Sequence, residues 1–127
     1  MPTFLIFRWA VSFDLTVLAL LEGAGDAEAR RMLERCQSRP HPEGELDERI
    51  VAFYEELRAV FPDTGPEAVS SESPWMMTPL SLGIDHVTMH LSYSPRSDPA
   101  IALIGELAEK YRLALFDHQS SEIVHRR

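Results

Sequence analysis

The stretch HVTMHLSY, residues 86–93, alternates between polar and apolar side chains at every position. Side chains that alternate in this way lie on opposite faces of a β-strand. The stretch SFDLTVLAL, residues 12–20, shows the same period, with Phe13 on one face and Asp14 and Thr16 on the other. The two stretches therefore predict two half-buried strands, each with one face toward the core and one toward water.

Three further segments carry apolar residues with the 3.6-residue period of an amphipathic helix. The stripe within residues 47–61 is the most regular of the three, and Asp47 is placed to cap that helix. Asp26 and Asp98 stand where the other two helices should begin. The predicted order is strand 12–20, helices 26–36 and 47–61, strands 80–82 and 86–93, helix 98–111, strand 113–117, and residues 122–127 as a short edge strand or a frayed end.

This order matches a ferredoxin-like split βαβ sandwich, an α+β fold in which an antiparallel sheet carries its helices on one face. The first crossover of the sheet would consist of two helices. In that topology the first and third strands are central neighbours, so the polar faces around Asp14 and His90 should adjoin. A chain of 127 residues has room for one domain, which we place at residues 11–127.

The composition narrows the classes of function. A formal net charge of -8 argues against nucleic acid and against an anionic membrane, because binding either requires clustered Lys and Arg. Cys36 is the only cysteine, so we expect no intramolecular disulfide, no thiolate metal cluster and a reducing, cytoplasmic compartment. Arg8 and Asp14 interrupt the apolar N-terminal stretch, which therefore predicts neither a signal peptide nor a membrane span. We expect no metal and no cofactor.

Several short motifs resemble those of a group of small uncharacterised bacterial proteins that open with Met-Ser-Phe-Asp-Leu and close near Asp-Pro-Gln. Here Val11 stands at the opening Met, and His118 replaces the proline of the closing motif. The resemblance implies a start at Val11, with residues 1–10 as a non-native extension, but it implies no reaction. The matching stretches are VSFDL at 11–15, HPEGELD at 41–47, RI at 49–50, SPW at 73–75, GIDHV at 83–87, MHL at 89–91, and Asp117 with Gln119.

The polar face of the two central strands is one candidate site. Asp14 and His90 can meet across adjacent strands as a carboxylate–imidazole pair of the kind used in general base catalysis. His86 and His90 are about 13 Å apart along one strand, too far to share a metal ion unaided. The competing interpretation is an ordinary solvated sheet face. The candidate ligand-binding residues are Asp14, Thr16, His86, His90, Asp117 and His118.

The long segment 62–79 is the other candidate, because structureless loops of this length are uncommon and are often functional. Trp75 could anchor a protein partner on this loop, or it could equally hold the loop against the core. Acidic residues near the start of the second helix could attract a basic partner, although they also complement the helix dipole. The candidate partner-binding residues are Trp75, Glu43, Glu45 and Asp47.

No phosphate-binding loop, nucleophile elbow or other complete catalytic set is visible, so we assign no catalytic residue. The sequence favours a small cytoplasmic protein-binding module, for example an immunity protein against a toxin. The alternative is a small-molecule-binding protein or minor enzyme that uses the open sheet face. A homodimer that covers this face with a second copy is a third possibility, so the chain is expected to be a monomer or a homodimer.

Overall fold

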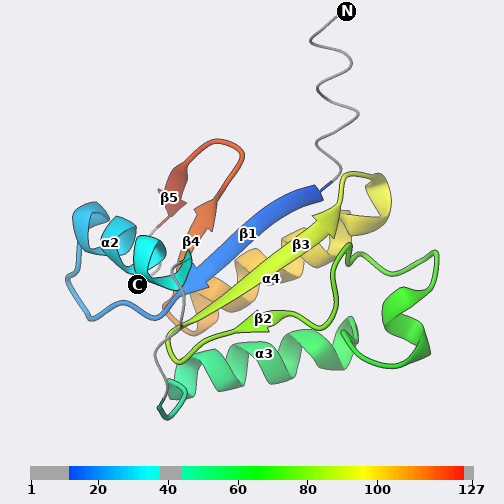
Figure 1. Ribbon diagram of the computed structural model, residues 1–127, viewed down its shortest axis with the longest axis horizontal. Helices are drawn as coiled ribbons and strands as arrows, with labels where there is room; N and C mark the ends of the chain where they lie inside the picture. Colours follow the sequence, from blue (N-terminus) through cyan, green and yellow to red (C-terminus); the bar gives the residue numbers. More distant parts are fainter. Residues whose placement is uncertain (1–11, 38–43, 125–127) are drawn as a thin grey trace, which may run out of the picture.

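The computed structural model describes residues 12–37 and 44–124, so the predicted extension 1–10 and Glu43 lie outside the described residues (Figure 1). The predicted elements are present in the described ranges, with boundaries close to those expected from the periodicity. The strands are β1 (Ser12–Leu18), β2 (Ser81–Leu82), β3 (His86–Ser92), β4 (Ala114–Asp117) and β5 (Glu122–Val124). The α-helices are α2 (Asp26–Gln37), α3 (Glu48–Val60) and α4 (Asp98–Lys110), and short 3-10 helices are η1 (Pro66–Val69) and η2 (Pro95–Ser97).

The strands form one antiparallel sheet in the order β2-β3-β1-β4-β5. The prediction of an α+β fold built on an antiparallel sheet is confirmed. β1 and β3 lie side by side at its centre, and their register places Asp14 opposite His90 and Thr16 opposite Thr88 (Figure 1). The polar faces of the two strands therefore adjoin, as their alternation predicted.

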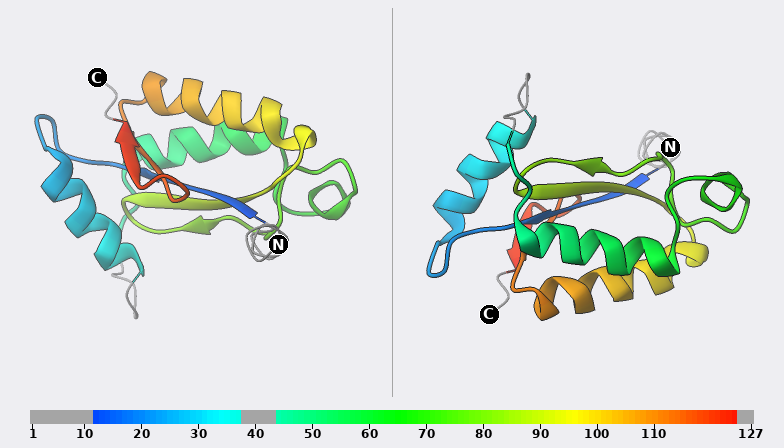
Figure 2. Two further views of the ribbon diagram at one scale, coloured as in Figure 1. Left: turned by 90° about the horizontal axis from the view of Figure 1, so that it is seen from above. Right: turned by 90° about the horizontal axis from the view of Figure 1, so that it is seen from below.

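Helices α3 and α4 pack side by side on one face of the sheet and build the main core with it (Figure 2). Apolar side chains of β1 and β3 meet apolar side chains of the two helices there, which explains why these four elements have the most regular sequence periods. The fully buried members of this core include Val17, Ile50, Phe53, Leu57, Val87, Met89, Leu91 and Ile104.

No helix in the described ranges is long and apolar enough to cross a membrane.

Helix α2 lies on the opposite face, which corrects the prediction that the helices share one face (Figure 2). Its Ala29 and Cys36 pack with Leu18 and Leu20 of the chain at and after the end of β1, and with Ala114 of β4. The side chains of β1 on this face are polar at first and become apolar from Leu18 onward. Burying that apolar end requires a cover, and α2 supplies it.

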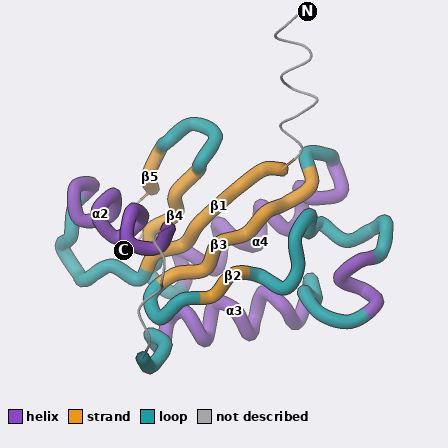
Figure 3. Tube along the Cα trace, in the orientation of Figure 1, coloured by secondary structure: helices purple, strands orange, loops and turns teal. Residues whose placement is uncertain are grey.

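The long connection between α3 and β2 extends out beyond the sheet and carries η1 (Figure 3), and side-chain hydrogen bonds near its ends tie it to the core. The carboxylate of Asp63 is 1% exposed and accepts hydrogen bonds from the Tyr54 hydroxyl (2.9 and 3.0 Å) and from the Leu80 backbone N–H (2.9 Å). Farther along, the buried hydroxyl of Ser97 donates to the Pro74 carbonyl oxygen at 3.2 Å. These contacts fix both ends of the segment, so it is an ordered part of the fold.

Candidate functional site

The sheet face opposite α3 and α4, which we call the outer face, carries a cluster of polar side chains beyond the part that α2 covers. At its centre, Nδ1 of His90 lies 2.8 Å from Oδ1 of Asp14 across the β1–β3 pair. Two residues along each strand, the hydroxyl oxygens of Thr16 and Thr88 are 3.1 Å apart. Both contacts follow from the strand register, because directly opposed residues present their side chains on the same face.

His118 joins this cluster from the turn that follows β4. Its backbone N–H donates to the Asp14 carbonyl oxygen at 3.2 Å, and its Nε2 lies 2.8 Å from the Thr16 hydroxyl oxygen. Its ring also meets the Phe116 ring edge-on, with centroids 4.7 Å apart. We define the polar cluster as Asp14, Thr16, Thr88, His90 and His118.

Gln119 supports the cluster although the sequence analysis did not select it. Its side-chain oxygen accepts from the Asp14 N–H at 2.7 Å, and its side-chain nitrogen donates to the Asp14 carbonyl oxygen at 3.0 Å. The side chain thus completes the hydrogen bonding of β1 where β4 has ended. This role depends on where β4 ends, which the sequence pattern does not show.

The Asp14–His90 pair is half-buried, with side chains 29% and 30% exposed. An imidazole whose Nδ1 is held by a carboxylate presents Nε2 as a proton acceptor, which is the geometry of a general base or a hydrogen-bonding ligand site. Thr16 is only 1% exposed, so its hydroxyl is a structural link to His118 and not an accessible nucleophile. The cluster can therefore bind and move protons, with His90 as its accessible group.

Burial lowers the pKa of His118 below its ordinary value. The nearby imidazole of His90 acts in the same direction, whereas the carboxylates of Asp14 and Asp117 oppose it. His118 is therefore neutral near pH 7, and it shares its hydrogen bond with Thr16 without adding a positive charge to the polar cluster.

Protonation of His118 should make the protein less stable as the pH falls. Because the pKa of His118 is lower in the folded chain than in the unfolded chain, the unfolded chain gains the proton first. The stabilisation is complete above the unfolded value of 6.5 and is lost as the pH falls from there toward the folded pKa. Thermal unfolding between about pH 7.5 and about pH 5 should show a shallower decline for His118→Gln, which keeps a hydrogen-bonding group but cannot titrate. Identical slopes for the two proteins would contradict this assignment.

No family model, curated protein or solved structure matches the chain. The polar cluster is therefore interpreted from its own geometry.

Two predicted ligand-binding residues lie outside the polar cluster. His86 is at the opposite end of β3, where it is 2% exposed and its Nδ1 lies 3.1 Å from Oδ1 of Asp85. The side chain of Asp117 accepts from the backbone N–H and the side-chain nitrogen of Gln119 at 2.8 and 2.7 Å, so it shapes the turn after β4. The six predicted residues thus divide into a cluster of four and two residues with other contacts.

Trp75 takes the second of its two predicted roles and holds the loop against the core. Its side chain is 5% exposed, its ring N–H donates to the Phe61 carbonyl oxygen at 3.0 Å, and its backbone forms an isolated bridge with Leu91. The prediction of an exposed anchor at Trp75 is therefore wrong. An indole that is buried in this way leaves little surface for a partner.

The predicted acidic patch is only partly described. Glu45 is exposed, whereas Asp47 caps α3 by accepting from the Arg49 backbone N–H at 2.8 Å. Burial acts to raise the pKa of Asp47, but hydrogen bonds from the side chain and backbone of Arg49 lower it overall. Arg49 also donates to the Leu20 and Arg112 carbonyl oxygens at 3.0 and 3.1 Å. Asp47 is thus a helix cap that also holds Arg49 in a structural junction.

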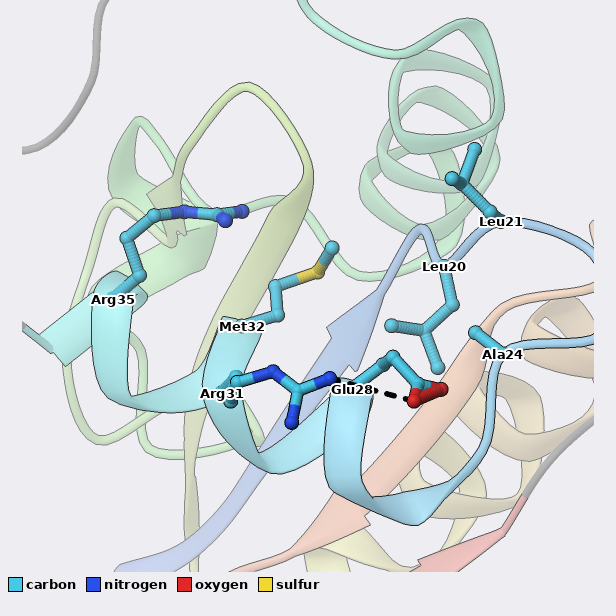
Figure 4. A pocket seen from close by; sticks show the side chains of 7 residues that line it. All are labelled: Leu20, Leu21, Ala24, Glu28, Arg31, Met32 and Arg35. Carbon is cyan, nitrogen blue, oxygen red and sulfur yellow. Dashed lines mark hydrogen bonds and ion pairs between the residues drawn. The ribbon is translucent and has the colours of Figure 1, made fainter.

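A separate hollow of about 240 Å³ lies between α2 and the chain that leaves β1 (Figure 4). Its walls combine apolar and charged side chains, and two of the charged ones, Arg31 and Glu28, pair at 3.4 Å. No residue of the polar cluster lines it. The lining residues are Leu20, Leu21, Ala24, Glu28, Arg31, Met32 and Arg35.

Proposed function

We propose that the protein binds a small polar molecule on the outer face of its sheet, at the Asp14–His90 pair. The observation that carries this proposal is the 2.8 Å contact between the half-exposed imidazole and the carboxylate. Among the described residues, Asp14 contacts the His90 ring through Nδ1. The other ring nitrogen of His90, Nε2, is therefore the atom that a ligand would use.

The chemistry of the cluster defines the class of ligand. Asp14 holds the Nδ1 proton of His90, so Nε2 accepts a hydrogen bond from a hydroxyl, amine or amide N–H of the ligand. Thr88 adds a half-buried hydroxyl beside it. A ligand with an acidic proton would be deprotonated by the same atom, which is the minor-enzyme form of this proposal. Neutral His118 limits the positive charge of the site, so a polar solute with donor groups fits better than a polyanion.

We further propose that the fold is a variant of the ferredoxin-like split βαβ sandwich. The central placement of β1 beside β3 supports this, whereas the fifth strand and the position of α2 are departures from that topology. We also propose kinship with the small bacterial group that shares the opening and closing motifs. The lone, buried Cys36 supports function in a reducing, cytoplasmic compartment.

A ligand-detected NMR screen tests the binding proposal. The probes are small water-soluble compounds that carry hydroxyl, amine or amide groups. Compounds that bind the wild-type protein should bind His90→Gln about tenfold more weakly or worse, because the variant lacks the imidazole acceptor. Met77→Ala, at an exposed side chain of the 62–79 loop, is the control and should bind as the wild type does. Equal binding to His90→Gln and wild type would place the site elsewhere.

A second candidate function is binding to another protein, for example as an immunity protein. Its support is a set of exposed apolar side chains on or near the 62–79 loop, with Val69 76%, Met76 42% and Met77 60% exposed, together with the net charge of -8. Tagged protein from the native cell should then recover a stoichiometric basic partner, and Met77→Asp should lose it. Light scattering after size exclusion separates this from a homodimer, which would double the mass without a partner.

A further inference from the structure

Three side chains with metal-binding atoms meet at the end of the outer face that α2 covers. Cys36 comes from the last turn of α2, Asp85 from the turn between β2 and β3, and His86 from the first position of β3. One ligand atom from each residue lies within 4.8 Å of the ligand atoms of the other two. This cluster is separate from the polar cluster, because His86 and His90 are about 13 Å apart along β3.

The spacing of the three atoms approaches that of ligands around one ion. Oδ1 of Asp85 lies 3.1 Å from Nδ1 of His86 and 3.9 Å from Sγ of Cys36. In a tetrahedral zinc site the ordinary bond lengths place neighbouring ligand atoms about 3.4–3.6 Å apart. The third pair, the Cys36 sulfur and a ring nitrogen of His86, lies within 4.8 Å, so the side chains would have to draw together by up to about 1 Å to bind a single cation.

The surrounding residues hold the three groups in place. Cys36 is 7% exposed and His86 is 2% exposed, and the other carboxylate oxygen of Asp85 pairs with the Arg35 guanidinium. Gly83 faces the His86 ring so closely that a Cβ there would lie 2.1 Å from Cε1 of the imidazole. The ring position thus depends on a residue without a side chain. Such fixed orientation of the ligands is typical of metal sites.

We propose that Cys36, Asp85 and His86 bind a divalent cation of the zinc class, with a fourth position left for water. One sulfur, one nitrogen and one oxygen ligand favour zinc and its neighbours over magnesium or calcium, which prefer oxygen ligands alone. The sequence analysis expected no metal because a single cysteine cannot form a thiolate cluster and because His86 and His90 are too far apart along one strand to share an ion. Cys36 reaches His86 because α2 lies on the outer face of the sheet.

Without a cation, the thiol of Cys36 keeps its proton. Burial, followed by the nearby carboxylate of Asp85, raises the pKa of Cys36 to about 12. The thiol then donates a hydrogen bond to Asp85. A bound cation would take the place of this proton between sulfur and oxygen and release the proton to solvent, because thiolate is the form of cysteine that ligates metals.

Titration of the wild-type protein with Co²⁺ under reducing conditions tests the proposal. Cobalt stands in for zinc, and a thiolate ligand gives it a near-ultraviolet charge-transfer absorption. Because Cys36 is the only cysteine, such an absorption identifies its sulfur as a ligand without any variant. We expect the absorption to saturate at a stoichiometric amount of Co²⁺ and to disappear when Zn²⁺ is added. Absence of the absorption at saturating Co²⁺ would overturn the proposal, whatever the outcome of the variants.

Two variants test the other ligands. His86→Gln and Asp85→Asn should each weaken Co²⁺ binding at least tenfold, since even residues outside the ligand sphere cost about 10–100-fold in metal affinity when changed. His90→Gln removes a histidine from the same strand and face and should bind Co²⁺ as the wild type does. Far-ultraviolet circular dichroism checks the fold of each protein. Unchanged affinity in both folded variants, or a loss in His90→Gln, would also overturn the proposal.

Discussion

Replacing Trp75 by alanine should lower the free energy of unfolding by about 4 kcal/mol, the usual cost of deleting a buried large aromatic side chain. The indole is 5% exposed and packs in the main core, and its N–H donates to the Phe61 carbonyl oxygen. Its removal leaves both a cavity and a carbonyl oxygen without its donor. Equilibrium unfolding in urea, followed by circular dichroism, measures the loss.

Two controls separate this structural role from a role in partner binding. Trp75→Phe keeps an aromatic ring but lacks the donor, so it should cost less than the alanine variant. Met77→Ala changes a side chain that is 60% exposed in the same loop and should alter stability by no more than about 0.5 kcal/mol. A Trp75→Ala variant as stable as Met77→Ala would contradict burial of the indole.

Replacing Asp63 by alanine should destabilise the protein by about 3 kcal/mol. The buried carboxylate is the acceptor for both the Tyr54 hydroxyl and the Leu80 N–H, so its loss leaves two donors without their partner. Burial, strengthened by the hydrogen bond to Asp63, raises the pKa of Tyr54 to about 12. The hydroxyl therefore remains a donor throughout the pH range in which the protein is studied.

The Asp63 prediction has its own controls. Asp63→Asn keeps one acceptor oxygen and should lose less than the alanine variant, whereas Glu67→Ala changes an exposed carboxylate of the same loop and should be nearly neutral. Thermal and urea unfolding of the three variants gives the order. If Asp63→Ala were as mild as Glu67→Ala, the loop would not depend on this carboxylate.

The elements of the main core could be predicted because each follows a single period over many residues. The alternation in β1 and β3 placed Asp14 and His90 on adjoining faces, so that their contact could be named in advance as one possibility. The register that sets them directly opposite each other comes from the structure. The supporting role of Gln119 could not be predicted, since it depends on where β4 ends.

Other features depend on contacts that no local pattern encodes. The apolar stripe of α2 is the same whichever face of the sheet it covers, and the decisive signal was the change from Asp14 and Thr16 to Leu18 within β1. Asp63 is one acidic residue in a polar loop, and only the folded chain brings Tyr54 to it. The meeting of Cys36 with His86 depends in turn on the placement of α2.

The most direct test of the proposed binding function is chemical-shift mapping of the backbone amides of the wild-type protein with the compounds that bind in the NMR screen. Binding at the Asp14–His90 pair predicts that the shifted amides concentrate in the middle of β1 and β3, around Thr16, Thr88 and His90, and in the turn at His118. Shifts concentrated instead on the 62–79 loop, or the absence of any bound compound, would contradict a small-molecule site on the outer face.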